Sequence, residues 1–133
     1  MNYKMVQFNK NFKHDLEFGE IREQKVADIF LNEKIEVKTE RDTWFTTGNI
    51  AIEIKYRNED SGLRTTESKY WMHILDYNGQ QFCTLMFEVA TLRKLVNELL
   101  DQEKAVIKMG GDDKQSTLVL IPISKIFTVA NQI

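Results

Sequence analysis

The sequence of 133 residues contains one cysteine and one proline, and it has no apolar run long enough to span a membrane. The lone Cys83 excludes a disulfide framework and favours a reducing compartment, so we interpret it as a buried, unreactive thiol. The N-terminal residues 1–14 lack the apolar core of a signal peptide. We therefore expect a soluble, cytoplasmic protein with no membrane partner.

The two signs of charge are nearly balanced, because the chain has 18 Lys and Arg residues and 20 Asp and Glu residues, for a formal net charge of −2. Any nucleic-acid site must therefore be a local basic patch, or must use a metal ion to offset phosphate charge. The histidines His14 and His73 share no ligand spacing with Cys83, so a zinc site is not expected. The length predicts one domain over residues 1–133.

Two segments alternate between apolar and polar residues, residues 34–41 (KIEVKTER) and residues 49–56 (NIAIEIKY). A period of two is typical of a strand with one buried face. The connection between them contains Gly48, so we expect an antiparallel hairpin. In that hairpin Glu36 would face Glu53, and like charges in this position destabilise a sheet. A cation between the two carboxylates would remove the repulsion.

Helical periodicity predicts two amphipathic helices, one over residues 16–31 and one that begins with Thr91 as its cap. Asn78-Gly79 predicts a tight hairpin turn. Weaker patterns predict an arm or strand over residues 1–14, a short helix near 65–69, a last hairpin of 105–109 with 117–123, and a final strand over 126–129. Together these elements predict an α/β (α+β) fold, in which a central mixed β-sheet is flanked by helices.

Three motifs follow one another in a recognisable order: Gly19-Glu20-Ile21-Arg22-Glu23 on the first helix, then Ile35-Glu36-Val37-Lys38, then Ile52-Glu53-Ile54-Lys55. Over residues 16–75 the chain resembles the PD-(D/E)xK nuclease superfamily, and within it the archaeal and phage Holliday-junction resolvases. The resemblance implies a restriction-endonuclease-like core. It also implies a homodimeric, magnesium-dependent endodeoxyribonuclease that cuts branched DNA, with manganese as a substitute ion.

The resemblance implies a catalytic group of Glu23, Glu36, Glu53, Lys55 and Lys38, in which the three glutamates are the metal ligands and Glu20 is the alternative to Glu23. The chain departs from the family at one point, because it lacks the usual Pro-Asp on the strand before Glu-x-Lys. That acid is Glu36, Glu40 or Asp42, and the symmetry of the expected hairpin favours Glu36. In a rival mapping Glu36-Val37-Lys38 is itself the Glu-x-Lys motif, and Lys38 replaces Lys55 as the working lysine.

These residue types suit phosphodiester hydrolysis. Magnesium takes oxygen ligands and keeps several waters, so two or three carboxylates are sufficient to hold it. A bound ion lowers the pKa of its water, and a lysine can orient that water or the phosphate. Three other interpretations stay open: a solvated strand face with cross-strand ion pairs, a non-catalytic DNA-binding or assembly module on a degraded nuclease fold, and a nuclease of the same fold that acts on linear DNA or RNA.

Basic residues gather in the middle third of the chain, where they would form a local phosphate-binding surface. The neighbouring aromatic residues Trp44 and Phe45 lie in the connection after the first strand, and we expect them to contact DNA or a second subunit. The segment 61–66 resembles a flexible substrate loop, although a plain connection fits it equally well. The expected DNA contacts are Lys34, Arg41, Trp44, Arg57, Arg64 and Lys69.

Overall fold

The computed structural model describes residues 10–133. The chain forms two compact units, Met1–Glu33 and Lys34–Ile133, and the single domain over residues 1–133 stays a prediction. The first unit contains α1 (Lys10–Asn32), which includes the whole of the predicted helix. The arm or strand expected over 1–14 is wrong for 10–14, which are helical, and residues 1–9 lie outside the described part. Among the described residues, no helix has the length and apolar character needed to cross a membrane.

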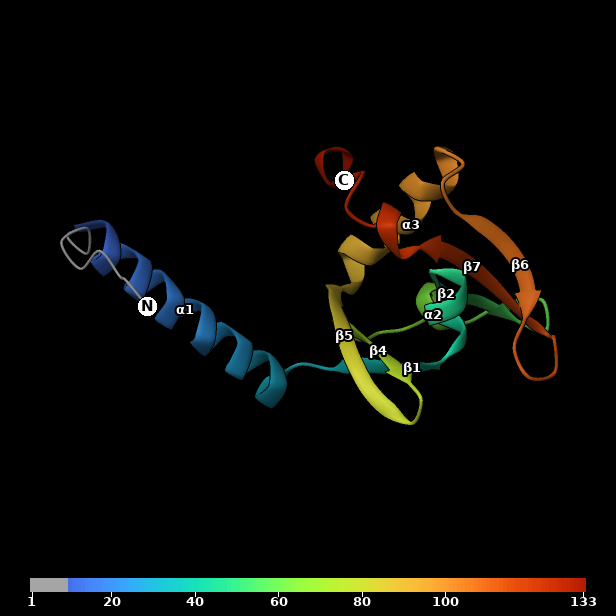
Figure 1. Cartoon of the computed structure of the whole chain (residues 1–133), viewed down its shortest axis with the longest axis horizontal. Helices are drawn as coiled ribbons and strands as arrows, with labels where there is room; N and C mark the ends of the chain where they lie inside the picture. Colours follow the sequence, from blue (N-terminus) through green and yellow to red (C-terminus); the bar gives the residue numbers. More distant parts are fainter. Residues whose placement is uncertain (1–9) are drawn as a thin grey trace. The chain divides into compact units, whose positions relative to one another are not determined.

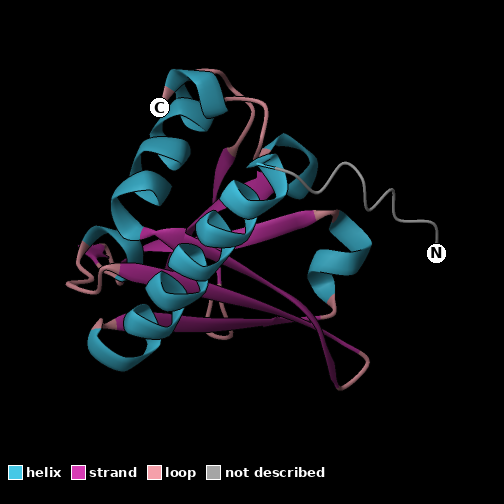
Figure 2. Cartoon of the chain, turned by 90° about the vertical axis from the view of Figure 1, so that its left-hand side faces the viewer, coloured by secondary structure: helices cyan, strands magenta, loops and turns pink. Residues whose placement is uncertain are grey.

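The second unit is mixed α/β, which confirms the predicted class at this level (Figure 1). Its strands form two sheets, with the orders β1-β4-β5 and β3-β2-β7-β6. In Figure 2 the strands of this unit cross one another and do not lie in one flat layer. The elements are β1 (Ile35–Arg41), α2 (Thr43–Thr47), β2 (Asn49–Tyr56), β3 (Glu59–Asp60), η2 (Gly62–Arg64), β4 (Tyr70–Tyr77), β5 (Gln80–Glu88), α3 (Val89–Asp101), β6 (Val106–Gly110), β7 (Ser116–Pro122), η3 (Ile123–Lys125) and η4 (Ala130–Gln132).

The predicted hairpin of residues 34–41 with 49–56 is wrong. Both segments are strands, but β1 pairs in parallel with β4, while β2 pairs antiparallel with β7. The connection is the short helix α2, whose Trp44 is buried and whose C-cap Gly48 is left-handed with φ 74°. A two-strand hairpin needs a short turn, and a helical connection instead sends the two strands into different sheets.

The faces of β1 are also reversed from the expectation. Val37 is 53% exposed, whereas Glu36, Lys38 and Glu40 are half-buried. In the parallel register Lys38 lies opposite His73, so the charged side of β1 shares a face with the buried side of β4. Polar partners inside this sheet therefore decide which face of β1 turns inward.

The other hairpins are confirmed. Antiparallel β4 and β5 meet at Asn78 and Gly79, which have φ 52° and 79°, the left-handed values that such a turn requires. Strands β6 and β7 form the last hairpin. Three smaller expectations are wrong: α3 begins at Val89 and not at Thr91, residues 126–129 form turns and not a strand, and the expected short helix is replaced by η2 at Gly62–Arg64.

The core of the second unit lies between the two sheets and α3. Strand β2 contributes its alternating isoleucines, and α3 contributes Leu92 and Leu99, which are fully buried at helical spacing. Trp71 is 1% exposed on β4, and Cys83 is half-buried against the same core. Because the apolar side chains of β2 face this core, its polar side chains, Glu53 and Lys55, lie on the opposite face.

Candidate functional site

The carboxylate of Glu40 joins β1 to β2. Its Oε1 accepts the backbone N–H of Ala51 at 2.5 Å and lies 2.5 Å from Nε2 of His73. Ala51 pairs with Leu120 of β7, but its N–H donates to Glu40 of β1 and not to β7. This N–H therefore points to the edge of β2 that faces away from β7. Glu40 thus takes the place on the edge of β2 that a neighbouring strand would otherwise fill.

A chain of hydrogen bonds supports Glu40 from inside the molecule. The indole N–H of Trp71 donates to Nδ1 of His73 at 3.1 Å, and His73 is 1% exposed. An indole nitrogen can only donate, so Nδ1 is the acceptor, and in the neutral ring Nε2 carries the proton. That proton is donated to Glu40, and the buried polar groups are therefore satisfied in sequence from Trp71 to Glu40.

Glu53 is held by two serines. Its Oε1 accepts the Ser116 hydroxyl at 2.7 Å, and its Oε2 accepts the Ser61 hydroxyl at 2.9 Å. Glu53 follows Ala51 by two residues, which is about 7 Å along a strand and returns to the same face. The two carboxylates thus meet β2 in different ways, because Glu40 of β1 accepts from the edge of the strand at Ala51, whereas Glu53 projects from β2 itself.

Gly62 lets the η2 segment lie directly on Glu53. Its φ is +54°, and a Cβ at this position would lie 2.2 Å from the backbone oxygen of Glu53. That oxygen belongs to a paired strand, so it cannot move aside as a flexible side chain would. Only glycine fits a position with both a left-handed φ and such a close approach.

We expect Gly62→Ala to lower the free energy of unfolding by at least about 1 kcal/mol more than Gly48→Ala does. Gly48 is the matched control, because it has φ +74° but no atom within 4 Å of an added Cβ. Both variants carry the left-handed strain, and only Gly62→Ala carries the collision with Glu53. Urea unfolding measures the difference, and equal losses would contradict the close approach.

Glu36 is not a partner of Glu53, so the expected facing pair is wrong. Its Oε1 lies 3.0 Å from Nζ of Lys38 on the same strand, and the Lys38 ammonium also lies 5.9 Å from the centre of the Trp71 ring. Glu36 and Lys38 therefore pair with each other within β1. Of the three acids that fit the motif, the structure connects Glu40 to β2.

Lys55 lies on β2 after Glu53, beyond a register shift in the pairing with β7. Within the described residues, its ammonium group makes no hydrogen bond or ion pair. The next residue, Tyr56, donates its hydroxyl to Asp113 at 2.6 Å, which raises the pKa of Tyr56 and lowers the pKa of Asp113. Because Lys55 has no such partner among the described residues, its ammonium group is available to a ligand.

The expected DNA contact at Trp44 is wrong. Trp44 is 6% exposed, and its indole N–H donates to the backbone oxygen of Asp76 at 2.6 Å. Phe45 is 54% exposed and stacks on Tyr77 at 4.1 Å between ring centres. Of these two neighbouring aromatic residues, Phe45 is the one exposed to a partner. The other five expected contacts are exposed and stay predictions: Lys34, Arg41, Arg57, Arg64 and Lys69.

Glu23 lies on α1, where it is exposed together with Val26 and Phe30. Glu20 is exposed as well. Since α1 forms a separate unit, the place of Glu23 in a metal site stays a prediction. Over residues 10–133, no group of three or more His, Cys, Asp or Glu side chains is arranged to hold a metal ion.

Sequence reasoning missed the partners that hold the two carboxylates. His73 had a usable signal, because Trp71 and His73 are two residues apart on one strand and must share a face. Ser116 had none, since it is 63 positions from Glu53. Ser61 is eight positions from Glu53, but it lies in the segment 61–66, whose pattern fitted a plain connection as well as a substrate loop.

The chain matches no protein-family model, no curated protein and no solved structure. Its function is therefore inferred from its own side chains and from the order of its motifs. Strand β2 carries one hydrogen-bonded carboxylate, Glu53, and Lys55, which has no partner among the described residues, while a second carboxylate, Glu40 of β1, binds the edge of the strand. Such a set of oxygen donors suits a hard cation.

Proposed function

We propose that the protein is a magnesium-dependent endodeoxyribonuclease of the Holliday-junction resolvase type, with a restriction-endonuclease-like core in the unit Lys34–Ile133. The observation that carries this proposal is the hydrogen bond from Ala51 to Glu40, two residues before Glu53 on β2. Glu40 then supplies the acid of the preceding strand, and Glu53-Ile54-Lys55 supplies the Glu-x-Lys. Manganese would substitute for magnesium.

The donor set fits the ion. Magnesium in phosphoryl-transfer sites is held by one or two carboxylates, with phosphate oxygens and waters completing the shell. Ligating carboxylates are themselves held by hydrogen bonds from a second layer of residues, which here are His73 for Glu40 and the two serines for Glu53. When bound, the ion would activate a water molecule and neutralise charge on the phosphate.

The remaining groups have defined tasks in this proposal. Lys55, as an unpaired point charge, orients the attacking water or the scissile phosphate. The exposed basic residues hold the DNA backbone without reading its sequence. A four-way junction presents two symmetric strands, so a twofold homodimer would cut both of them.

Lys55→Ala should lower the turnover of DNA cleavage by at least about tenfold, with DNA affinity nearly unchanged, because the lysine acts in the transition state. Lys38→Ala is the matched control. Its ammonium is already paired with Glu36 at 3.0 Å, so cleavage should persist. Single-turnover rates with labelled DNA measure both variants. An inactive Lys38→Ala beside an active Lys55→Ala would instead favour Glu36-Val37-Lys38 as the working motif.

A second candidate is a non-catalytic DNA-binding or assembly module on a degraded nuclease fold. Two observations favour it: both oxygens of Glu53 already accept hydrogen bonds from serines, and residues 10–133 contain no cluster of three metal-ligating side chains. This candidate predicts that the protein shifts junction DNA in a gel but leaves it uncut in every metal.

The two candidates are separated by incubating the protein with a labelled four-way junction and with a linear duplex, in magnesium, in manganese and in excess chelator. The nuclease proposal predicts paired incisions in the junction with either metal, slower cutting of the duplex, and none with chelator. Cutting in excess chelator would contradict metal dependence. Equal cleavage rates on the junction and the duplex would contradict the resolvase assignment and favour a nuclease that acts on linear DNA.

A further inference from the structure

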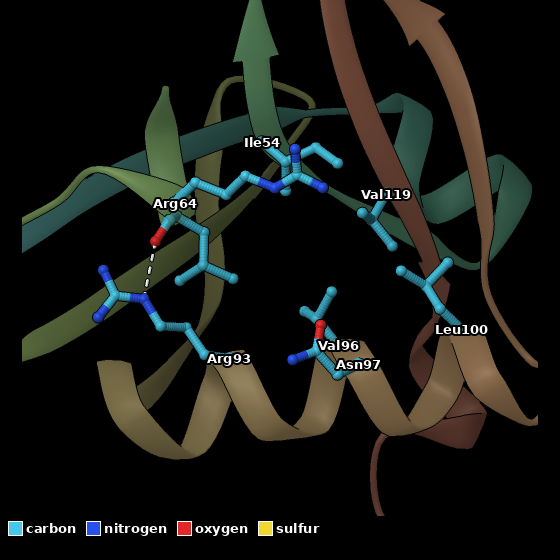
Figure 3. A pocket seen from close by; sticks show the side chains of 8 residues that line it. Ile54, Arg64, Arg93, Val96, Asn97, Leu100 and Val119 are labelled. Atoms are coloured by element: carbon cyan, nitrogen blue, oxygen red, sulfur yellow. Dashed lines mark hydrogen bonds between the residues drawn. The ribbon is translucent and has the colours of Figure 1, made fainter. Parts of the chain in front are cut away.

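A cavity of about 270 Å³ lies between β2, η2, α3 and β7, on the face of β2 opposite to Glu53 (Figure 3). Its walls are mostly apolar, and are formed by Ile54, Leu63, Val96, Leu100 and Val119. This volume is close to the lower end of the range for small-molecule sites, which is about 300–1,000 Å³. The cavity is thus large enough for a compact ligand, and it is separate from the site on the other face of the strand.

The charged groups at the cavity, Arg64 and Arg93, are both positive. The guanidinium of Arg64 extends over the cavity, and the amide of Asn97 on α3 lies on the other side (Figure 3). Within the described part of the chain, no carboxylate lines the cavity. Arg64 forms an ion pair with Asp60 at 3.2 Å, but both side chains are largely exposed, and such surface pairs are weak. Its other N–H groups are available to a ligand.

The wall formed by η2 is fixed before any ligand arrives. Nε of Arg93 donates to the backbone oxygen of Leu63 at 3.0 Å, and Nη2 of Arg93 donates to the backbone oxygen of Thr66 at 2.9 Å. Figure 3 shows the Arg93 side chain reaching this segment from α3. The backbone N–H groups of Thr65 and Thr66 both donate to Gly62. Since the segment is already ordered, binding loses little conformational entropy.

We infer that this cavity binds a small organic anion, in which one carboxylate or phosphate is attached to an apolar group about the size of a single ring. The apolar group would pack against Leu100, which is half-buried, and over the small exposed parts of Val96 and Leu63. The anion would bind the guanidinium of Arg64, whose planar fork matches carboxylate and phosphate oxygens. The Asn97 amide would donate a further hydrogen bond. This inference does not depend on the proposed nuclease function.

The test uses the full chain labelled with ¹⁵N and follows its amide resonances during titration with phenyl phosphate and with benzoate. We expect saturable shifts at Leu63, Asn97 and Val119 with at least one of these anions, and the tighter one identifies the class of anion. Benzyl alcohol and benzylammonium have the same ring without the anion, and should bind at least about tenfold more weakly.

Arg64→Gln should weaken binding of the better anion by at least about tenfold, while Arg57→Gln should leave it unchanged. Arg57 is the matched control, because it is an exposed arginine that does not line the cavity. The ¹⁵N spectrum of each variant reports on its fold in the same experiment. The inference is overturned if neither anion shifts the cavity amides, if benzyl alcohol binds equally well, or if Arg64→Gln binds as tightly as the unchanged protein.

Discussion

Glu40→Gln and Glu53→Gln should each lower the rate of DNA cleavage in magnesium by at least about a hundredfold, because each removes a charged ligand of the ion. Both should change the free energy of unfolding by less than about 1 kcal/mol. A glutamine oxygen can still accept from Ala51 and His73 at position 40. At position 53 the amide keeps one acceptor, and a serine hydroxyl can accept from its NH₂ group.

Glu36→Gln is the control for both variants. Its carboxylate is paired with Lys38 on its own strand, so cleavage should stay within a fewfold of the unchanged protein. Single-turnover cleavage of a junction and urea unfolding of all three variants make the comparison. If Glu36→Gln abolishes cleavage and Glu40→Gln does not, then the assignment of Glu40 as the first acid is wrong.

His73→Ala should lower the free energy of unfolding by about 3–5 kcal/mol. The imidazole is 1% exposed, so its loss leaves a cavity in the core. The indole N–H of Trp71 then has no acceptor, and Glu40 loses one of its two donors. The expected loss is large because the buried indole of Trp71 and the half-buried carboxylate of Glu40 lose this partner at the same time.

The control for this variant is His14→Ala, which changes the only other histidine of the chain at an exposed position of α1. It should alter the free energy of unfolding by less than about 0.5 kcal/mol. Equilibrium unfolding in urea measures both. A loss below about 1 kcal/mol for His73→Ala would mean that the Trp71–His73–Glu40 chain does not stabilise the fold.

Much of the fold could be predicted because it depends on local patterns. The alternation in residues 34–41 and 49–56 identified both strands, and Asn78-Gly79 identified a hairpin turn with its left-handed φ values. The partner of each strand could not be read in the same way. Alternation fixes the two faces of a strand, but pairing depends on segments far along the chain, such as β4 for β1.

The same distinction applies to the candidate site. The motif Glu53-Ile54-Lys55 is local and could be found, whereas the first acid stayed open among Glu36, Glu40 and Asp42. That choice depends on which of these acids reaches β2, and the contact that Glu40 makes joins strands of different sheets. The burial of a single residue could not be predicted either. Trp44 lies in a connection, where the sequence led us to expect an exposed side chain, but the rings of Tyr77 and Phe82 pack against it.

The most direct test of the proposed metal site is the anomalous diffraction of a crystal soaked in manganese. The nuclease proposal predicts one peak with carboxylate oxygens of Glu40 and Glu53 among its ligands, at about 2.0–2.3 Å. It also predicts that this peak is lost in Glu53→Gln. A manganese ion bound only elsewhere, with Glu40 still accepting from Ala51 and Glu53 from both serines, would contradict the metal site.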